Sequence, residues 1–172
     1  MQDLLNDVLG KGGIFCGGFV RDYLIRGESF SDIDFFFPGE WPEPYISWKY
    51  RRDWPGHEVV ENYADGVKFN CIKIEPLEFS CNVFCFDGKN VFPRAVCRPM
   101  DYINAWELLL QKKYIMQVPG FKNVVFEHKI KKKGWEKAKL VWTHGEIDVP
   151  PATGPWANFT LAKERFDKLL KQ

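Results

Sequence analysis

Hydrophobic and polar positions follow short, regular patterns along this chain. Apolar residues at near-helical spacing predict one helix from the N-terminus to about Leu9 and a second helix directly after Gly18. Short apolar or alternating runs predict strands at about 13–16, 32–37, 58–61, 67–74 and 77–86. Turn residues at 65–66 and 87–90 separate some of these runs and predict tight reversals. The pattern thus predicts strands and helices mixed along the sequence.

Two further helices are expected in the second half of the chain. Asp101 is placed to cap a helix through about Met116, and an amphipathic helix begins at about Asn158. The first of these is expected to bury a stripe made of Ile103, Trp106, Leu110 and Tyr114. The second is expected to bury a stripe made of Ala162, Phe166, Leu169 and Leu170.

The chain has the size of one catalytic domain. Its 172 residues are 45% hydrophobic, which is enough to bury a sizeable core. We expect an α/β (α+β) fold, with a mixed β-sheet flanked by helices over residues 1–116. Residues 117–172, a lysine-rich segment and a C-terminal helix, are expected to form a small appendage packed on it.

Net charge and cysteine content indicate which partners and which cellular compartment to expect. The formal net charge is +1, so the chain as a whole does not indicate a polyanion-binding protein. The five cysteines are an odd number and lie mostly at apolar, strand-like positions, which is typical of a reducing compartment. No signal peptide or membrane span is evident in the sequence. We therefore expect a cytoplasmic protein without membrane contact, in a cell or, if phage-encoded, in the infected host.

A glycine pair, Gly17 and Gly18, follows the first predicted strand and precedes a predicted helix. Glycine permits backbone angles and close approaches that a side chain would block. Free amide groups at a strand-to-helix junction favour an anion, so the pair is a candidate phosphate-binding turn. A tight turn without a ligand is the alternative interpretation.

A carboxylate pair, Asp32 and Asp34, begins the strand at 32–37. Residues two apart in a strand share a face, so both carboxylates should project together while Ile33 and Phe35 point into the core. Two adjacent carboxylates repel each other unless a cation or water screens them, and oxygen ligands suit Mg²⁺ or Mn²⁺. The alternative is a solvated strand beginning after a turn.

The segment GGFVRDYLIRGESFSDIDFFF resembles the glycine and Asp-x-Asp signature of the DNA-polymerase-beta-like nucleotidyltransferase superfamily. The nearest form is the head domain of class II tRNA nucleotidyltransferases and poly(A) polymerases, here as a short phage- or bacterial-type member. The resemblance covers residues 13–37. Arg26-Gly27 stands where the family commonly has Gly-Arg, and the spacer to Asp32 is one residue longer than usual. Family motifs for base selection are not evident. Arg51-Arg52-Asp53 superficially resembles the first of them, but it comes too soon after Asp34 and lacks the continuation.

The resemblance implies a nucleotidyltransferase fold and a site for Mg²⁺ (or Mn²⁺). Asp32 and Asp34, with a third carboxylate from a neighbouring strand, would hold the metal ions. Alternation places Glu78 on the polar face of the strand predicted at 77–86, which makes it the candidate third ligand. Gly17 and Gly18 would hold phosphate. Arg21 could neutralise a phosphate or contact the sugar, or it could brace the helix by pairing with Asp22.

Two functions follow as hypotheses. The first is an enzyme that transfers a nucleoside monophosphate from a nucleoside triphosphate such as ATP to a hydroxyl on RNA, protein or a small molecule. The second is a catalytically silent module that keeps the fold and binds nucleotide or protein. The segment from His128 to Trp142 is a possible RNA-binding patch, or else a solvated helix face. Its charged and aromatic residues are Lys129, Lys131, Lys132, Lys133, Lys137 and Lys139, with Trp135 and Trp142 between them.

Overall fold

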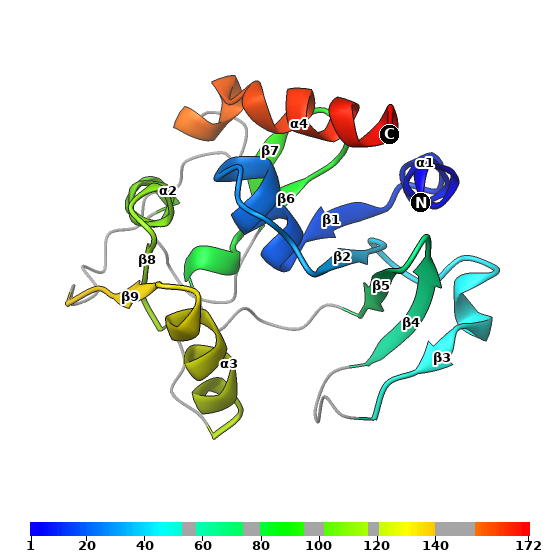
Figure 1. Cartoon of the computed structure of the whole chain (residues 1–172), viewed down its shortest axis with the longest axis horizontal. Helices are drawn as coiled ribbons and strands as arrows, with labels where there is room; N and C mark the ends of the chain where they lie inside the picture. The colour runs from blue at the N-terminus through cyan, green and yellow to red at the C-terminus, as the bar shows by residue number, and fades with distance from the viewer. Residues whose placement is uncertain (53–57, 74–79, 95–101, 117–120, 140–153) are drawn as a thin grey trace.

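A seven-stranded sheet in the order β3–β4–β5–β2–β1–β6–β7 forms the centre of the computed structural model (Figure 1). The structure describes residues 1–52, 58–73, 80–94, 102–116, 121–139 and 154–172. The strands of this sheet are β1 (Ile14–Cys16), β2 (Asp32–Phe36), β3 (Lys49–Tyr50), β4 (Val59–Ala64), β5 (Val67–Ile72), β6 (Phe84–Phe86) and β7 (Val91–Pro93). Strand β2 runs parallel to β5, and the other neighbours are antiparallel, so the sheet is mixed.

Helices flank this sheet, as the sequence predicts. They are α1 (Gln2–Gly10), α2 (Tyr102–Leu110), α3 (Phe121–Lys132), α4 (Leu161–Leu170), the π-helix η1 (Phe19–Ile25) and the 3₁₀ turns η2 (Tyr45–Ser47), η3 (Ser80–Asn82) and η4 (Pro155–Asn158). A second, two-stranded parallel sheet joins β8 (Lys113–Tyr114) to β9 (Glu136–Lys137). The protein is therefore a mixed α/β structure.

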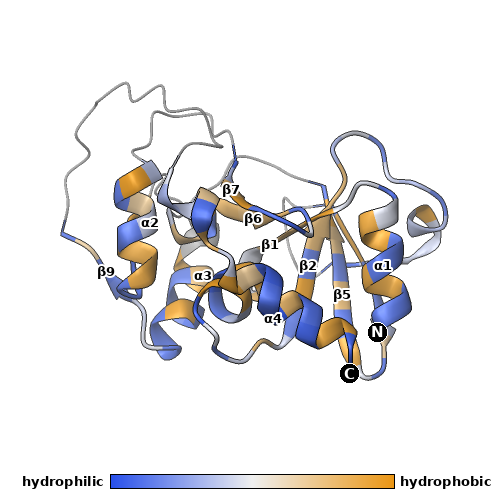
Figure 2. Cartoon of the chain, turned by 90° about the horizontal axis from the view of Figure 1, so that it is seen from above, coloured by the Kyte–Doolittle hydropathy of each residue, from blue (hydrophilic) through white to orange (hydrophobic). Residues whose placement is uncertain are grey.

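The main core lies on the face of the sheet that α1, η1 and α4 cover. Side chains alternate along a strand, and the rings of Phe15, Phe35 and Phe69 are fully buried on this face. Phe166 of α4 packs on Phe15 and Phe86, with ring centroids 5.5 and 5.3 Å apart. In Figure 2 both α1 and α4 carry hydrophobic and hydrophilic residues, as expected for helices that bury one side.

The described C-terminal residues contribute to the same core. Trp156 packs on Phe84 at 5.3 Å between ring centroids, and Ala162, Phe166 and Leu169 are buried. Three members of the stripe predicted for the last helix are therefore confirmed as buried positions. Hydrophobic residues that are distant in sequence close one cluster around the sheet.

The π-helix η1 connects β1 to β2, where the sequence predicts a helix. Its end is held from α4, because the Arg165 guanidinium donates to the carbonyls of Leu24 and Ile25 at 2.8 Å each. Gly27 follows with a φ of +71°, and Arg165 occupies the space that a Cβ there would need. The C-terminal helix thus fixes the segment that leads into β2.

The prediction of one strand over 77–86 is wrong for residues 80–82. Residues 80–82 form the 3₁₀ turn η3, and only Phe84–Phe86 pair in the sheet. The Ser80 hydroxyl accepts a hydrogen bond from the Ile115 amide at 2.7 Å, which holds the chain away from the sheet. Residues 77–79 lie outside the described residues. The hairpin at 87–90 is confirmed, with Gly88 at a φ of +96°.

The helix expected to reach Met116 ends at Leu110, so that prediction is wrong too. The Arg26 guanidinium donates to the carbonyls of Leu109 and Leu110 at 3.0 and 2.7 Å, which satisfies the end of the helix. Lys112 then adopts a φ of +60°, and the chain turns into β8. The buried stripe also differs from the expected one, since Ile103 and Leu110 are exposed. It consists of Ala105, Trp106, Leu108 and Leu109.

The apolar positions predicted for the cysteines are confirmed where the structure describes them, because these cysteines are buried and none is in a disulfide. They are Cys16, Cys71, Cys81 and Cys85. Within the described part of the chain, no helix is long and apolar enough to cross a membrane.

The packing of α4 yields a stability prediction. Replacing Phe166 with Ala removes a fully buried ring and should lower the free energy of unfolding by about 3–5 kcal/mol in urea titrations. The matched control is Leu161→Ala on the same helix, whose side chain is exposed and should cost less than about 1 kcal/mol. Equal losses for the two variants would contradict this role of α4.

Candidate active site

The side chains of Asp32 and Asp34 project from the same face of β2, opposite to Ile33 and Phe35. Ile33 and Phe35 are fully buried in the main core, while both aspartates are partly exposed. This confirms the alternation read from the sequence. We call the side of β2, β5 and β4 that carries these aspartates the acid face.

The glycine turn lies directly beside the acid face. Gly17 follows β1, where Cys16 pairs with Asp34, and it has a φ of +64°. A Cβ built on Gly17 would lie 2.6 Å from Oδ2 of Asp34, so this position requires glycine for space as well as for backbone angle. Gly18 is more open, because a Cβ built there would lie 3.5 Å from the nearest side-chain atom, Oδ2 of Asp22. The turn and the carboxylate pair, adjacent in the sequence argument, are in contact in the fold.

Asn70 of β5 bridges the two aspartates. Its register partner on the parallel strand β2 is Asp34, and its side chain is fully buried. The Nδ2 group donates to Oδ1 of Asp34 at 2.8 Å and to Oδ2 of Asp32 at 3.2 Å. One neutral amide therefore satisfies an oxygen on each carboxylate without supplying a positive charge.

Arg51 fixes the orientation of this amide. Its Nη1 donates to Oδ1 of Asn70 at 3.2 Å, and its Nε lies 3.6 Å from Oε2 of Glu61 on β4. Because the oxygen of Asn70 faces a guanidinium, its NH₂ group is directed at the aspartates. Glu61, Arg51 and Asn70 thus form a polar chain that ends at the carboxylate pair.

The two carboxylates carry more negative charge than their surroundings neutralise. Burial raises the pKa of Asp34 to about 7, and repulsion from Asp32 adds to the shift. The hydrogen bond from Asn70 and the more distant charges of Arg51 and Arg21 lower the pKa of Asp34 without cancelling the shift. The Asp34 carboxyl group is therefore easily protonated near neutral pH, and a cation bound beside it would favour its ionised form.

The residues present fit one divalent cation better than a closed metal cage. Asp32 and Asp34 supply hard oxygen ligands, and the rest of a six-ligand shell would come from water or substrate. Among the residues that the structure describes, no three Asp, Glu, His or Cys side chains form a metal-binding group. Glu78, the predicted third ligand, lies outside the described residues.

Arg21, the third residue predicted to bind the nucleotide, is buried and makes its contacts within the protein. Its guanidinium is 3% exposed and forms two bonds of 2.7 Å with the carboxylate of Asp22, which is equally buried. Its Nη1 donates to Asn82 at 3.0 Å, and its plane lies over the ring of Trp135. This geometry favours the bracing role that the sequence left open over contact with a phosphate.

The lysine-rich segment contains the end of α3 and the short strand β9. Trp135 is buried, and the guanidinium carbons of Arg21 and Arg26 lie 5.1 and 5.6 Å from its ring centroid. It is therefore not available to stack on a nucleic-acid base. Lys133 pairs with Asp22 at 3.4 Å, and Lys131 with Glu127 at 3.3 Å. Trp142 lies outside the described residues.

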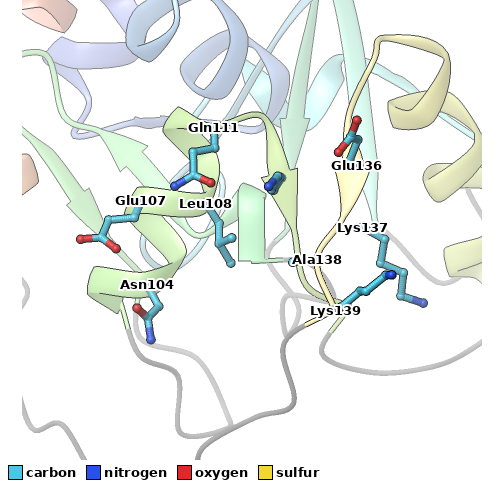
Figure 3. Close-up of a pocket in the computed structure, with 9 residues that line it drawn as sticks. Asn104, Glu107, Leu108, Gln111, Glu136, Lys137, Ala138 and Lys139 are labelled. Atoms are coloured by element: carbon cyan, nitrogen blue, oxygen red, sulfur yellow. The ribbon is translucent and has the colours of Figure 1, made fainter.

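An open hollow of about 560 Å³ lies between α2 and β9, away from the acid face (Figure 3). Its rim mixes acidic, basic and amide side chains, among them Glu107, Gln111, Lys113, Glu136 and Lys139. Because its charges do not converge on one point, it is a weaker candidate site than the acid face.

Sequence reasoning missed Asn70 and the contact made by Arg51. Alternation over 67–72 places Lys68 and Asn70 on one face, which was the available signal for Asn70. Arg51 could not be found in this way, because its contact depends on the pairing of β3 with β4. Comparison of the chain with protein-family models, with curated proteins and with solved structures found no match. The acid face therefore has to be interpreted from its own chemistry.

Because folding raises the pKa of Asp34, the protein should be less stable at a pH where this carboxyl group is ionised. The folded protein holds this proton more tightly than the unfolded chain, so the stabilisation is complete below about pH 4 and is lost as the pH rises towards 7. In chelator at pH 8, Asp34→Asn should therefore raise the free energy of unfolding by about 1–3 kcal/mol. The gain should vanish at pH 4. A variant no more stable than the parent at pH 8 would show that folding does not raise the pKa of Asp34.

Proposed function

We propose that this protein is a metal-dependent nucleotidyltransferase, which moves a nucleoside monophosphate from a nucleoside triphosphate to a hydroxyl acceptor. The observation that carries the proposal is the contact between the Gly17 turn and a strained carboxylate pair, Asp32 and Asp34. The resemblance of residues 13–37 to the nucleotidyltransferase signature supports the same interpretation. So does a mixed sheet in which the aspartates lie next to the glycine turn.

Asp32 and Asp34 would hold the cation, as Mg²⁺ or Mn²⁺. When bound, it would neutralise charge on the triphosphate and lower the pKa of the acceptor hydroxyl. Asp34 has to lose its proton for this, and its carboxyl group does so near neutral pH. The Gly17–Gly18 turn carries no side chain of its own beside Asp34, so a phosphate could approach its backbone closely. Arg51 and Asn70 would keep both carboxylates in place.

Label transfer tests this proposal directly. Incubation with each labelled ribonucleoside triphosphate, Mg²⁺ and RNA, protein or small-molecule acceptors should transfer label. Asp32→Asn and Asp34→Asn should each reduce the rate by at least about 10²-fold, because each removes a charged metal ligand. Asp65→Asn, in the turn between β4 and β5, is the matched control and should retain the parent rate. Transfer that survives both substitutions would contradict the proposal.

Metal binding should depend on pH through Asp34. The cation binds the ionised carboxylate, so the affinity for Mn²⁺ should fall about tenfold between pH 8 and pH 6. Calorimetry at pH 7 in two buffers with different ionisation enthalpies should detect about half a proton released per Mn²⁺. Affinity that does not change with pH would show that Asp34 is not a ligand.

A catalytically silent nucleotide- or protein-binding module is the second candidate. The observation that favours it is Asn70, because the neighbouring strand β5 places a neutral amide, and not a carboxylate, beside Asp34. An amide lowers the charge available to a cation by one. Nucleotide binding that needs no metal and leads to no label transfer would support this function over the enzyme.

A further inference from the structure

The acid face continues beyond the aspartates across two more strands. Asp32 on β2 is the register partner of Lys68 on β5, and Lys68 is the register partner of Tyr63 on β4. Register partners in a sheet project from the same side. Asp32, Lys68 and Tyr63 therefore form one row that runs across the sheet, away from the glycine turn.

Lys68 has no partner in this row. Its side chain is partly buried, yet its ammonium group makes no ion pair or hydrogen bond with the described residues. Other lysines near the sheet are paired: Lys73 lies 3.4 Å from Glu58, and Lys49 lies 3.9 Å from Glu61. A lysine opposite Asp32, without an ion pair among the described residues, is suited to an anionic group of a ligand.

Tyr63 is a large aromatic side chain that the sheet leaves exposed. Its exposed fraction is 61%, and it lies near the end of β4, opposite the partly buried Lys68 of β5. The side chains of the other residues on this row are charged. A flat aromatic ring beside a cation matches the two parts of a nucleotide, since rings stack on bases and ammonium groups bind phosphate.

The distance across the row also fits a nucleotide. The strands β1, β2, β5 and β4 are consecutive in the sheet, so the glycine turn after β1 and Tyr63 on β4 are three strand spacings apart. At about 4.8 Å per spacing this is about 14 Å. An extended nucleoside triphosphate can reach from one to the other, with its phosphates over the aspartates.

We propose that Lys68 and Tyr63 form the subsite for the nucleoside end of the triphosphate. In this arrangement the Tyr63 ring stacks on the base, and the Lys68 ammonium group binds the phosphate nearest the sugar. The glycine turn would receive the other end of the triphosphate. This inference rests on the proposed function, because it assumes that the acid face binds a nucleotide.

Calorimetric titration with ATP and with inorganic triphosphate, each with Mn²⁺, tests the subsite. Lys68→Gln should weaken both ligands about five- to fiftyfold, because a charge-assisted hydrogen bond to phosphate is lost. Tyr63→Ala should weaken ATP about five- to a hundredfold and leave inorganic triphosphate unchanged, because only ATP has a base to stack. Tyr63→Phe keeps the ring and should bind ATP as the parent does.

Two control variants come from the neighbouring strand β3. Tyr50 is also exposed, at 52%, but it pairs with Val60 and so projects from the opposite face of the sheet. Lys49 pairs with Glu61, so it projects from the same side of the sheet as the acid face but lies one strand beyond it, with 81% of its side chain exposed. Tyr50→Ala and Lys49→Gln should therefore leave the affinity for ATP unchanged.

The outcomes separate this inference from the proposed function. A parent protein that binds ATP, with both Lys68→Gln and Tyr63→Ala unchanged, would overturn the subsite and leave the nucleotidyltransferase proposal standing. A parent protein that binds neither ATP nor inorganic triphosphate would overturn both. Equal losses from Tyr63→Ala for the two ligands would also count against base stacking. Because both side chains project from a formed sheet, far-ultraviolet circular dichroism should show folded variants throughout.

Discussion

The repulsion between the carboxylates of Asp32 and Asp34 is the constraint on which the rest of the site depends. Strand geometry places both on one face of β2, and burial raises the pKa of Asp34 to about 7. The protein meets this cost with a bridging amide from Asn70, 2.8 Å from Asp34, and holds that amide with Arg51. A cation bound between the two carboxylates would remove the repulsion.

The fold supplies the rigidity that this arrangement needs. The parallel pairing of β2 with β5 sets Asn70 beside Asp34, and the antiparallel pairing of β1 with β2 sets Gly17 against the same carboxylate. Behind these strands, η1 is held by Arg165 from the C-terminal helix, whose Phe166 packs on the first strand. Elements from both ends of the chain therefore fix the glycine turn and the aspartates relative to each other.

The sequence predicted those features that depend on local periodicity. It located most of the strands, the helix after Gly18 and the shared face of Asp32 and Asp34, because each follows from spacing within a few residues. It failed where distant residues decide the local structure. Ser80 turns the chain by bonding to Ile115, and Arg26 ends α2 at Leu110, and neither contact leaves a periodic signal. Asn70 and Arg51 were not predicted for the same reason, since their role appears only when strand order and register are known.

The protonation of Asp34 is the most direct test of this account. Carbon-13 NMR of the aspartate carboxyl groups, titrated from pH 4 to pH 9, measures it without any assay of function. The account predicts that Asp34 titrates near pH 7 in chelator, and that its pKa falls to an ordinary value or below when Mg²⁺ is added. An Asp34 carboxyl group that titrates near pH 4, with and without Mg²⁺, would contradict it.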